Sequence, residues 1–495
     1  MQCSHLNKKN MWIVLSFLLV CRLISMYVMS LNDTTEARYG EIARIMLETG
    51  NWVTPMQTYG IPFWAKPPLS TWLSAFSMKL FGVNELAARL PSLLLSIGVL
   101  GLVWNVAKKQ SGMNVAITAV VVLAGSLFFM LDAGTVMTDP SLLFCITLSL
   151  VSFWKAISGN KFWSYIFFVG LGLGLLAKGP IAVVLTGMPI FIWTLWHKRW
   201  IALWQNLPWF KGTLLIILIA GPWYVLAEFR TPGFLNYFII GEHFHRFLDP
   251  GWGGDKYGFA HVAPLGMIWA YAFLSILPWS IIGLAWVIRH YKAVPALCRD
   301  NDGWMSYLAI CTLTPLVFFT FSSNIIYPYV FPSLPVFALL FAELTERAHA
   351  LPKRFFSLAS ISGFLFLLVA VLFVFRPEWV EKSQHRIVAA YQNIATSSQS
   401  KLIYWAQKTE FSSQFYSRGQ ARATLKADEL RAMLFQGVEP YVVVDLKYVD
   451  SIPNDLQKNL KQIDIIPILK NKFILFQFVP VKNRLINMRS RVTWE

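Results

Sequence analysis

The sequence predicts a polytopic α-helical membrane protein with about eleven to thirteen transmembrane helices, amphipathic helices in its first outer loop, and a small C-terminal α/β domain. Hydrophobic residues make up 56% of the 495 positions, which excludes an ordinary soluble domain. Apolar runs long enough to cross a bilayer recur along most of the chain. After Arg376 the composition changes to mixed polar sequence with only short apolar runs. These three observations set the fold class.

Eleven apolar segments are expected to span the membrane. The first is long and lacks a small-residue cleavage site before Asn32, so we interpret it as an uncleaved signal anchor. The predicted segments are 11–31, 90–106, 113–131, 141–157, 162–177, 181–196, 213–228, 262–288, 304–321, 329–344 and 355–375.

The formal charge of +17 is explained by topology rather than by nucleic-acid binding. The basic residues form short clusters between the spans, such as Lys108-Lys109, His197-Lys198-Arg199 and Lys353-Arg354. These clusters fall on the same side as the N-terminus, which the positive-inside rule makes cytoplasmic. We therefore expect membrane lipids and no nucleic acid among the partners.

The first outer loop, residues 32–89, holds an unusual density of paired charges. Apolar residues at helical spacing predict an amphipathic helix over 36–47, and the prolines at 67 and 68 open a second helix over 69–81. A turn at Gly60-Ile61-Pro62 reverses the chain between them. We expect these two helices to bring Asp33, Glu36 and Lys66 to one place at the membrane surface.

Carboxylates on the outer side are the candidate catalytic groups. Asp33 and Glu36 lie at the start of the first amphipathic helix, where capping is the alternative role for both. Asp139 precedes a proline at an outer span end, where a turn or a cap is again the alternative. At the mouth of a low-dielectric cavity, such carboxylates can act as a general base or orient an acceptor.

Cations on the outer side contribute nothing to topology and therefore indicate a bound anion. Lys66, Lys178 and Arg246 are predicted to converge there with His243, although a snorkelling side chain is the alternative for each lysine. The natural anion at that depth is a lipid phosphate. Nearby aromatic residues either form an interfacial belt or offer stacking faces for a sugar.

The sequence shows no strong metal or nucleotide motif. His243, His245 and Glu242 have no established ligand spacing, and the five cysteines predict neither a disulfide nor a zinc site. No Walker, Rossmann or G-x-S-x-G pattern occurs. The predicted chemistry therefore uses no recognised nucleotide site.

The chain is expected to divide into a membrane domain, residues 1–376, and a small α/β domain, residues 377–495. Short apolar runs at 401–405, 441–446 and 473–478 predict strands, and 426–435 predicts a helix. This C-terminal part is small for an independent domain.

An ordered set of short motifs resembles the GT-C glycosyltransferases of the protein O-mannosyltransferase and aminoarabinose (lipid A) transferase type. The motifs follow the family's order from Asp33 to about Pro335. They are Glu36-Ala37-Arg38-Tyr39, Lys66-Pro67-Pro68-Leu69, Leu80-Phe81-Gly82, Ala88-Arg89-Leu90-Pro91, Ala177-Lys178-Gly179-Pro180, Gly221-Pro222-Trp223-Tyr224, Glu242-His243, Arg246-Phe247, Leu277-Pro278-Trp279-Ser280 and Tyr329 with Pro332 and Pro335.

The resemblance implies transfer of a sugar from a polyprenyl (undecaprenyl) phosphate carrier to a lipid or protein acceptor, with lipid A or another envelope glycolipid favoured. It implies a multi-pass protein of the bacterial inner membrane with a cytoplasmic N-terminus and a periplasmic C-terminal domain. The implied site residues fall into three groups, which are catalytic Asp33, Glu36 and Asp139, phosphate-binding Lys66, Lys178 and Arg246, and cavity-lining Arg38, Tyr39, His243 and Tyr329.

Three positions depart from the family pattern. Thr35 stands where the family has the first residue of an acidic pair, Ala65 replaces a glutamate before Lys66, and Ile325 replaces a lysine. The missing glutamate binds a metal in some members, so a divalent cation is an open question and no cofactor is assigned. The alternatives are a protein O-mannosyltransferase-like enzyme, a non-enzymatic transporter of lipid-linked sugars, and an assembly protein that binds carrier lipid through its C-terminal domain.

Overall fold

The computed structural model describes residues 6–249, 252–258, 261, 263–299, 302–322 and 324–480. The chain forms two compact units. We call Met1–Met26 with Ile45–Leu367 the membrane unit, and Tyr27–Arg44 with Leu368–Glu495 the sheet unit. The sheet unit thus takes in residues 27–44, of which 27–31 were predicted to end the first span and 32–44 to begin the first outer loop. The division falls inside three helices, α1 (Lys8–Val28), α2 (Thr35–Thr49) and α19 (Ile361–Phe375).

The membrane unit consists almost entirely of helices. After α1 and α2 its elements are β1 (Met56–Thr58), β2 (Ile61–Pro62), α3 (Leu69–Phe81), α4 (Glu85–Ser111), α5 (Met113–Gly125), α6 (Leu127–Asp132), α7 (Asp139–Ile157), α8 (Lys161–Lys178), α9 (Ile181–Trp196), α10 (Trp200–Asn206), α11 (Trp209–Arg230), η1 (Asn236–His245), α12 (Arg246–Leu248), α13 (Met267–Ser275), α14 (Trp279–His290), α15 (Val294–Leu297), α16 (Trp304–Thr320), η2 (Tyr327–Ser333), α17 (Leu334–Arg347) and α18 (Phe355–Ala359).

Over its described residues, each of the eleven predicted spans coincides with a helix or a broken helix; residue 262, where the eighth predicted span begins, lies outside the described residues. Within the described residues, seven helices are long and apolar enough to cross a membrane, and one further pair is bent by 106° between α13 and α14. Three shorter apolar helices, α5, α9 and α16, account for the rest. The predicted helices over 36–47 and 69–81 are α2 and α3. The polytopic helical fold is confirmed.

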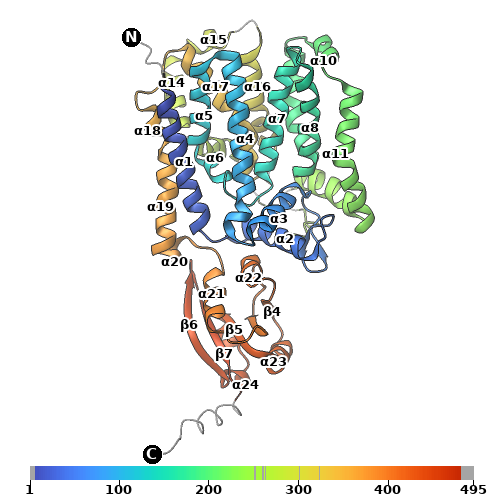
Figure 1. Cartoon of the computed structure of the whole chain (residues 1–495), viewed down its shortest axis with the longest axis vertical. Helices are drawn as coiled ribbons and strands as arrows, with labels where there is room; N and C mark the ends of the chain where they lie inside the picture. The colour runs from blue at the N-terminus through green and yellow to red at the C-terminus, as the bar shows by residue number, and fades with distance from the viewer. Residues whose placement is uncertain are drawn as a thin grey trace, which may run out of the picture. The chain divides into compact units, whose positions relative to one another are not determined.

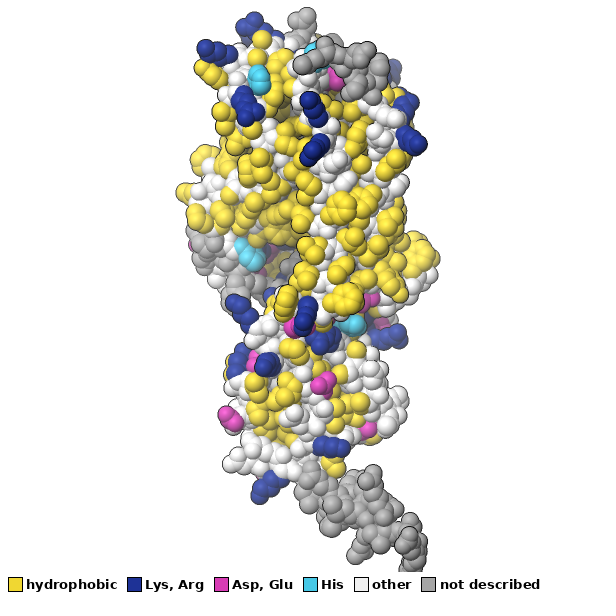
Figure 2. Space-filling model, turned by 90° about the vertical axis from the view of Figure 1, so that its left-hand side faces the viewer, with side chains coloured by type: hydrophobic (Ala, Val, Ile, Leu, Met, Phe, Trp, Pro, Cys, Tyr) yellow, Lys and Arg dark blue, Asp and Glu magenta, His cyan; other side chains and the backbone are white. Residues whose placement is uncertain are grey.

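The core of the membrane unit lies around α5 and α7. Both helices are buried on nearly every side, which fits their almost continuous apolar sequence. Figure 1 shows α4, α7, α8 and α11 as neighbouring upright helices. In this row α4 packs against α7, α7 against α8, and α8 against α11. In Figure 2 hydrophobic side chains cover the middle of one face of this unit, while Lys and Arg side chains gather at its upper end.

The sheet unit is a five-stranded mixed sheet with helices on both faces. Its strand order is β4-β3-β5-β7-β6, with β3 parallel to β4 and β5, and β7 antiparallel to β5 and β6. The elements are α20 (Pro377–Val380), α21 (His385–Ile394), β3 (Ser400–Trp405), α22 (Phe411–Tyr416), β4 (Arg422–Thr424), α23 (Ala427–Gln436), β5 (Val438–Asp445), η3 (Leu446–Ser451), α24 (Asn454–Gln457), β6 (Leu460–Ile468) and β7 (Asn471–Phe478).

Alternation along β3 explains why the sheet is covered on both sides. Leu402 and Tyr404 pack with α21 in one hydrophobic cluster, whereas Ile403 and Trp405 pack with α23 in another. The three predicted strands are β3, β5 and β7, and the predicted helix is α23. β4 and β6 were not predicted, because β4 has only three residues and β6 is interrupted by Lys461, Gln462 and Asp464.

Candidate active site

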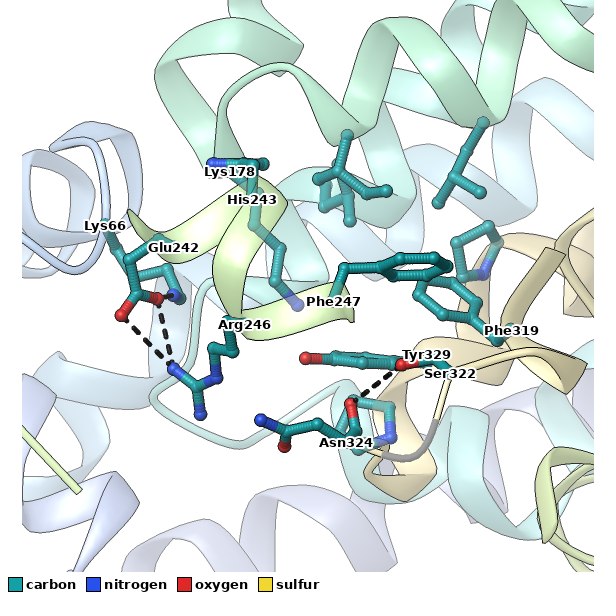
Figure 3. Close-up of a pocket in the computed structure, with 15 residues that line it drawn as sticks. Lys66, Lys178, Glu242, His243, Arg246, Phe247, Phe319, Ser322, Asn324 and Tyr329 are labelled. Atoms are coloured by element: carbon teal, nitrogen blue, oxygen red, sulfur yellow. Dashed lines mark hydrogen bonds and ion pairs between the residues drawn. The ribbon is translucent and has the colours of Figure 1, made fainter. Parts of the chain in front are cut away.

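A cavity of about 90 Å³ in the membrane unit collects three cationic side chains, Lys66, Lys178 and Arg246. They come from the loop before α3, the end of α8 and the start of α12. Figure 3 shows these side chains around the opening, with apolar side chains on the remaining walls. The structure therefore brings together the three residues that were predicted to bind phosphate.

Local sequence places Lys66 in this cavity. Pro67 and Pro68 follow it directly, and α3 begins at Leu69. A residue before proline is kept out of the helical region, so Lys66 belongs to the extended loop and not to the helix. Its ammonium group donates to the Glu242 Oε2 atom at 2.9 Å and to the Ala65 carbonyl at 2.7 Å. The lysine head is thus fixed before any ligand arrives.

Glu242 links two of the three cations. Its side chain is only 2% exposed, and its carboxylate accepts hydrogen bonds from Lys66 and from Arg246 Nη1 at 3.1 Å (Figure 3). It also accepts a hydrogen bond from the Tyr237 hydroxyl at 3.2 Å. Burial acts to raise the pKa of this carboxyl, but Lys66 and Arg246 outweigh burial and hold the pKa below its usual range. Glu242 is therefore ionised and keeps the two cations in place.

The π-helix η1 creates this arrangement. It carries Tyr237, Glu242 and His243, and π-helical turns are often found at functional sites. The His243 Nδ1–H group donates to the Phe238 carbonyl at 2.8 Å. Burial lowers the pKa of His243, so the ring is neutral and adds no charge to the cavity.

Lys178 and Asp139 form the second buried ion pair. Their charged atoms are 2.6 Å apart, and their side chains are 12% and 5% exposed. Gly179 ends α8 with a φ of +83°, and an added Cβ there would lie 2.5 Å from Phe238. Only glycine fits this turn, because it provides the backbone conformation and leaves room for η1. The turn thereby presents Lys178 to the cavity.

Tyr329 faces the same opening. Its ring centre lies 5.1 Å from the Lys178 ammonium nitrogen, and its hydroxyl points toward the Arg246 side (Figure 3). Ser322 and Asn324 line the cavity beside it. The opening thus offers three cations and several neutral hydrogen-bonding groups.

Asp132 is a buried carboxyl group near the Lys178–Asp139 pair that was not predicted from the sequence. It ends α6, is 1% exposed, and lies within electrostatic range of Asp139, Lys178 and Arg22. Neither carboxylate oxygen has a hydrogen-bond partner in the described part of the chain. The one sequence feature that could have pointed to Asp132 is its position directly after a predicted span. Glu242 was noted in the sequence only beside two histidines and was given no role.

Four of the site residues predicted from the first outer loop, Asp33, Glu36, Arg38 and Tyr39, lie in the sheet unit, whereas Lys66 lies in the membrane unit. Asp33 accepts hydrogen bonds from the Ser412 backbone N–H at 2.9 Å and from the Ser412 hydroxyl. Burial raises the pKa of the Asp33 carboxyl to about 7, and the Ser412 hydrogen bonds offset part of that rise. The Arg38 guanidinium lies 5.1 Å from the centre of the Phe411 ring. Glu36 and Tyr39 lie on the same helix, α2.

The grouping of Asp33, Glu36, Arg38 and Tyr39 with the cationic cavity therefore stays a prediction. Within the membrane unit, the predicted site residues that do meet are Lys66, Lys178, Asp139, His243, Arg246 and Tyr329. No group of three or more His, Cys, Asp or Glu side chains with metal-binding geometry occurs among the described residues.

Comparisons with known proteins test the family resemblance. The family model described as dolichyl-phosphate-mannose-protein mannosyltransferase matches residues 10–238. An undecaprenyl phosphate-alpha-4-amino-4-deoxy-L-arabinose arabinosyl transferase of Pseudomonas fluorescens is 29% identical over 63% of this chain and 53% of the relative. The enzyme of the same name from Aeromonas hydrophila is 26% identical over 74% of this chain and 66% of the relative. The chain thus spans about half to two thirds of the length of these relatives.

The fold is also that of a solved structure. The crystal structure of ArnT from Cupriavidus metallidurans, bound to undecaprenyl phosphate, matches with a TM-score of 0.75 and 19% identity, over 94% of this chain and 97% of the other. At this identity the likeness establishes the fold. Together, the ordered motifs, the family model and the relatives show that the chain is similar to the GT-C glycosyltransferases of the protein O-mannosyltransferase and aminoarabinose transferase type.

Proposed function

We propose that this protein transfers a sugar from a polyprenyl-phosphate carrier to a lipid acceptor at the membrane surface. The observation that carries the proposal is the convergence of Lys66, Lys178 and Arg246 on one partly apolar cavity. A lipid phosphate needs both features, because its charged head requires cations and its chain requires apolar walls. The names of the relatives make undecaprenyl phosphate the carrier to test first.

The charge of the cavity suits the leaving group. In this reaction the bond between the sugar C1 atom and the phosphate oxygen breaks, and a new bond forms between C1 and an acceptor hydroxyl oxygen. The carrier phosphate begins as a diester with one negative charge and leaves as a monoester with up to two. Fixed cations stabilise the transition state, in which the negative charge on the phosphate has grown, more than they stabilise the bound donor. They therefore lower the activation barrier for transfer as well as the dissociation constant of the donor.

The buried carboxylates complement these cations. Glu242 and Asp139 each hold a cation in place before the donor binds. Such preorganisation reduces the cost of arranging the site during reaction. Asp139 is also the carboxylate that we assign to the acceptor hydroxyl proton in the membrane unit, since its partner Lys178 faces the cavity.

The walls give the carrier chain a path. Ile181 and Leu185 of α9, Phe247, and Phe319 of α16 supply apolar contacts next to the cations. This arrangement fits the first isoprene units of a polyprenyl chain better than a free sugar phosphate, which offers no hydrocarbon to cover such walls. We propose an inner-membrane location with the N-terminus in the cytoplasm and the cavity opening to the periplasmic side.

Reconstituted protein tests the proposal directly. Proteoliposomes would receive undecaprenyl phosphate-linked 4-amino-4-deoxy-arabinose as donor and phosphorylated lipid A as acceptor. Mass spectrometry should show an acceptor heavier by one sugar residue and release of undecaprenyl phosphate in equal amount. Movement of the intact donor across the bilayer with no bond cleavage, for this and other polyprenyl-linked sugars, would instead identify a transporter and refute the proposal.

A further inference from the structure

A second and larger cavity lies in the membrane unit between α1, α4, α5 and α6. Its volume is about 440 Å³, roughly three times the ~150 Å³ of an apolar cavity that takes up benzene. It shares no lining residue with the cationic cavity described above. The space is therefore separate from the site assigned to the carrier phosphate.

The walls of this second cavity are almost wholly apolar. Ile97 and Leu100 from α4 and Leu15 from α1 line it, and small residues such as Ala124 leave it wide. Gly101 of α4 faces open space, because a Cβ added there would meet no atom within 4 Å. Trp12 and Ile97 are exposed apolar residues at its edge. In a bilayer such a space takes up hydrocarbon and excludes water.

One charged residue, Arg22, lines this cavity. Its guanidinium donates to the Leu131 carbonyl at 2.7 Å and to the Ser25 hydroxyl at 3.0 Å, and it is 6% exposed. A Cβ added to Gly134 would lie 2.4 Å from the arginine Nε atom, so the chain makes room for this side chain. A cation within a membrane span is costly and typically marks a functional site.

The charged end of the second cavity adjoins the proposed active site. Arg22 bonds to Leu131, and the next residue, Asp132, lies within electrostatic range of both Arg22 and the Asp139–Lys178 pair. A lipid with its chain in the cavity would thus place its head beside the groups that we assign to the acceptor. Charge complementarity makes that head anionic, because a guanidinium is well suited to phosphate and carboxylate.

We infer that this second cavity binds an acyl chain of the acceptor, a membrane lipid with an anionic head group near Arg22. The inference rests on the proposed function. The carrier has a single chain, and the apolar walls beside its phosphate site come from α7, α9, α12, α16 and η2, none of which lines the second cavity. A separate hydrocarbon site with its own cation therefore belongs to the second lipid of the reaction.

Photocrosslinking in proteoliposomes tests this inference. The probe is a lipid A analogue that carries a phosphate and a diazirine on one acyl chain. Gly101→Leu fills the open space without a steric clash and favours the helix, so it should lower crosslinking to α1 and α4 at least tenfold. The matched control is Gly187→Leu on α9, where a Cβ also meets no atom within 4 Å, and it should change crosslinking by less than twofold.

Two further arms identify the occupant and its head group. Excess undecaprenyl phosphate should leave the crosslink unchanged, and displacement of the probe would assign the cavity to the carrier and overturn the inference. Arg22→Gln should remove the preference for the phosphorylated over the dephosphorylated probe. Equal crosslinking by wild type and Gly101→Leu would also overturn it. None of these readouts needs sugar transfer, so failure here and failure of the proposed activity are distinguishable.

Discussion

Glu242 in the membrane unit and Asp33 in the sheet unit are both buried carboxyl groups, but the groups that contact them differ in charge. Glu242 faces two cations, Lys66 and Arg246. Asp33 faces a serine, Ser412, through its backbone amide and its hydroxyl. The pKa of Glu242 is lowered, whereas the pKa of Asp33 is raised to about 7. Burial acts to raise the pKa of both carboxyl groups, and only at Glu242 do cationic partners outweigh it.

This difference in pKa separates two roles for a buried carboxyl group, namely ordering a phosphate site and joining two chain segments. An ionised carboxylate that is neutralised by cations can hold a phosphate site in order. A carboxyl group that is about half protonated at pH 7 and hydrogen-bonded to a hydroxyl mainly joins two segments of the same unit. Asp33 was predicted as a catalytic residue, and its contacts with Ser412 favour the structural role.

The largest expected effect comes from removing a cation beside a buried carboxylate. Lys178→Met leaves Asp139 buried and uncompensated, which should destabilise the protein by about 3–5 kcal/mol. It also removes a phosphate contact, so transfer should fall at least about a thousandfold. Unfolding in detergent and the transfer rate in proteoliposomes measure the two effects.

A double variant separates folding from function in this pair. Lys178→Met with Asp139→Leu removes both charges, so stability should return close to wild type while transfer stays lost. Recovery of transfer in the double variant would show that the pair only supports the fold.

Lys66→Ala should lower transfer by about a hundredfold to a thousandfold, because the growing charge on the leaving phosphate loses one fixed cation. The matched control is Lys79→Ala on α3, where the side chain is exposed to the surroundings and away from the cavity. That control should keep transfer within about twofold. Equal loss in both variants would mean that positive charge near the membrane, and not the site, drives the reaction.

Glu242→Gln keeps the shape of the cation clamp and removes its negative charge. Burial already lowers the pKa of Lys66, and Glu242 opposes that shift. Without Glu242 the pKa of Lys66 falls further, so the high-pH limb of the transfer profile should move to lower pH. We expect a loss of roughly tenfold at pH 9 and little change at pH 6.5, measured as a pH–rate profile. A uniform loss at every pH would contradict this role for Glu242.

The sequence predicted the cationic cavity because its residues stand out against an apolar background. Lys66, Lys178 and Arg246 lie outside the basic clusters that set topology, and the structure brings them together. Helix periods and prolines likewise located α2 and α3. The sequence was enough to predict a site residue or a helix boundary wherever a charged residue or a proline had only one plausible role.

Pairing between distant segments could not be predicted in the same way. The contact of Asp33 with Ser412 joins positions 379 residues apart, and no local pattern marks it. The link from Glu242 to Lys66 spans 176 residues and depends on the π-helix η1, for which the sequence shows no dedicated signal. Asp132 was missed because a single acid at a span end resembles an ordinary helix terminus.

The smallest expected effect concerns Asp33, the buried carboxyl group of the sheet unit. Because the pKa of Asp33 is about 7 in the fold and the ordinary value is 3.8, the folded state favours the protonated group. That contribution is complete below about pH 4 and is lost as pH rises through about 7. The sheet unit should therefore be more stable at pH 5 than at pH 8, and Asp33→Asn should reduce this difference by roughly 2 kcal/mol after solvent screening.

Hydrogen exchange over residues 410–416 of the full-length protein measures this change, since the Ser412 amide donates to Asp33. Protection there should rise toward low pH in the wild type and respond less in Asp33→Asn. Glu381 and Glu410 also have pKa values raised by burial, so they leave a smaller slope of the same sign in the variant. Transfer by Asp33→Asn should stay within about threefold of wild type at pH 8, because a structural carboxyl acts only through the stability of its unit. Loss of transfer with unchanged protection would instead restore Asp33 to the catalytic role that the sequence first indicated.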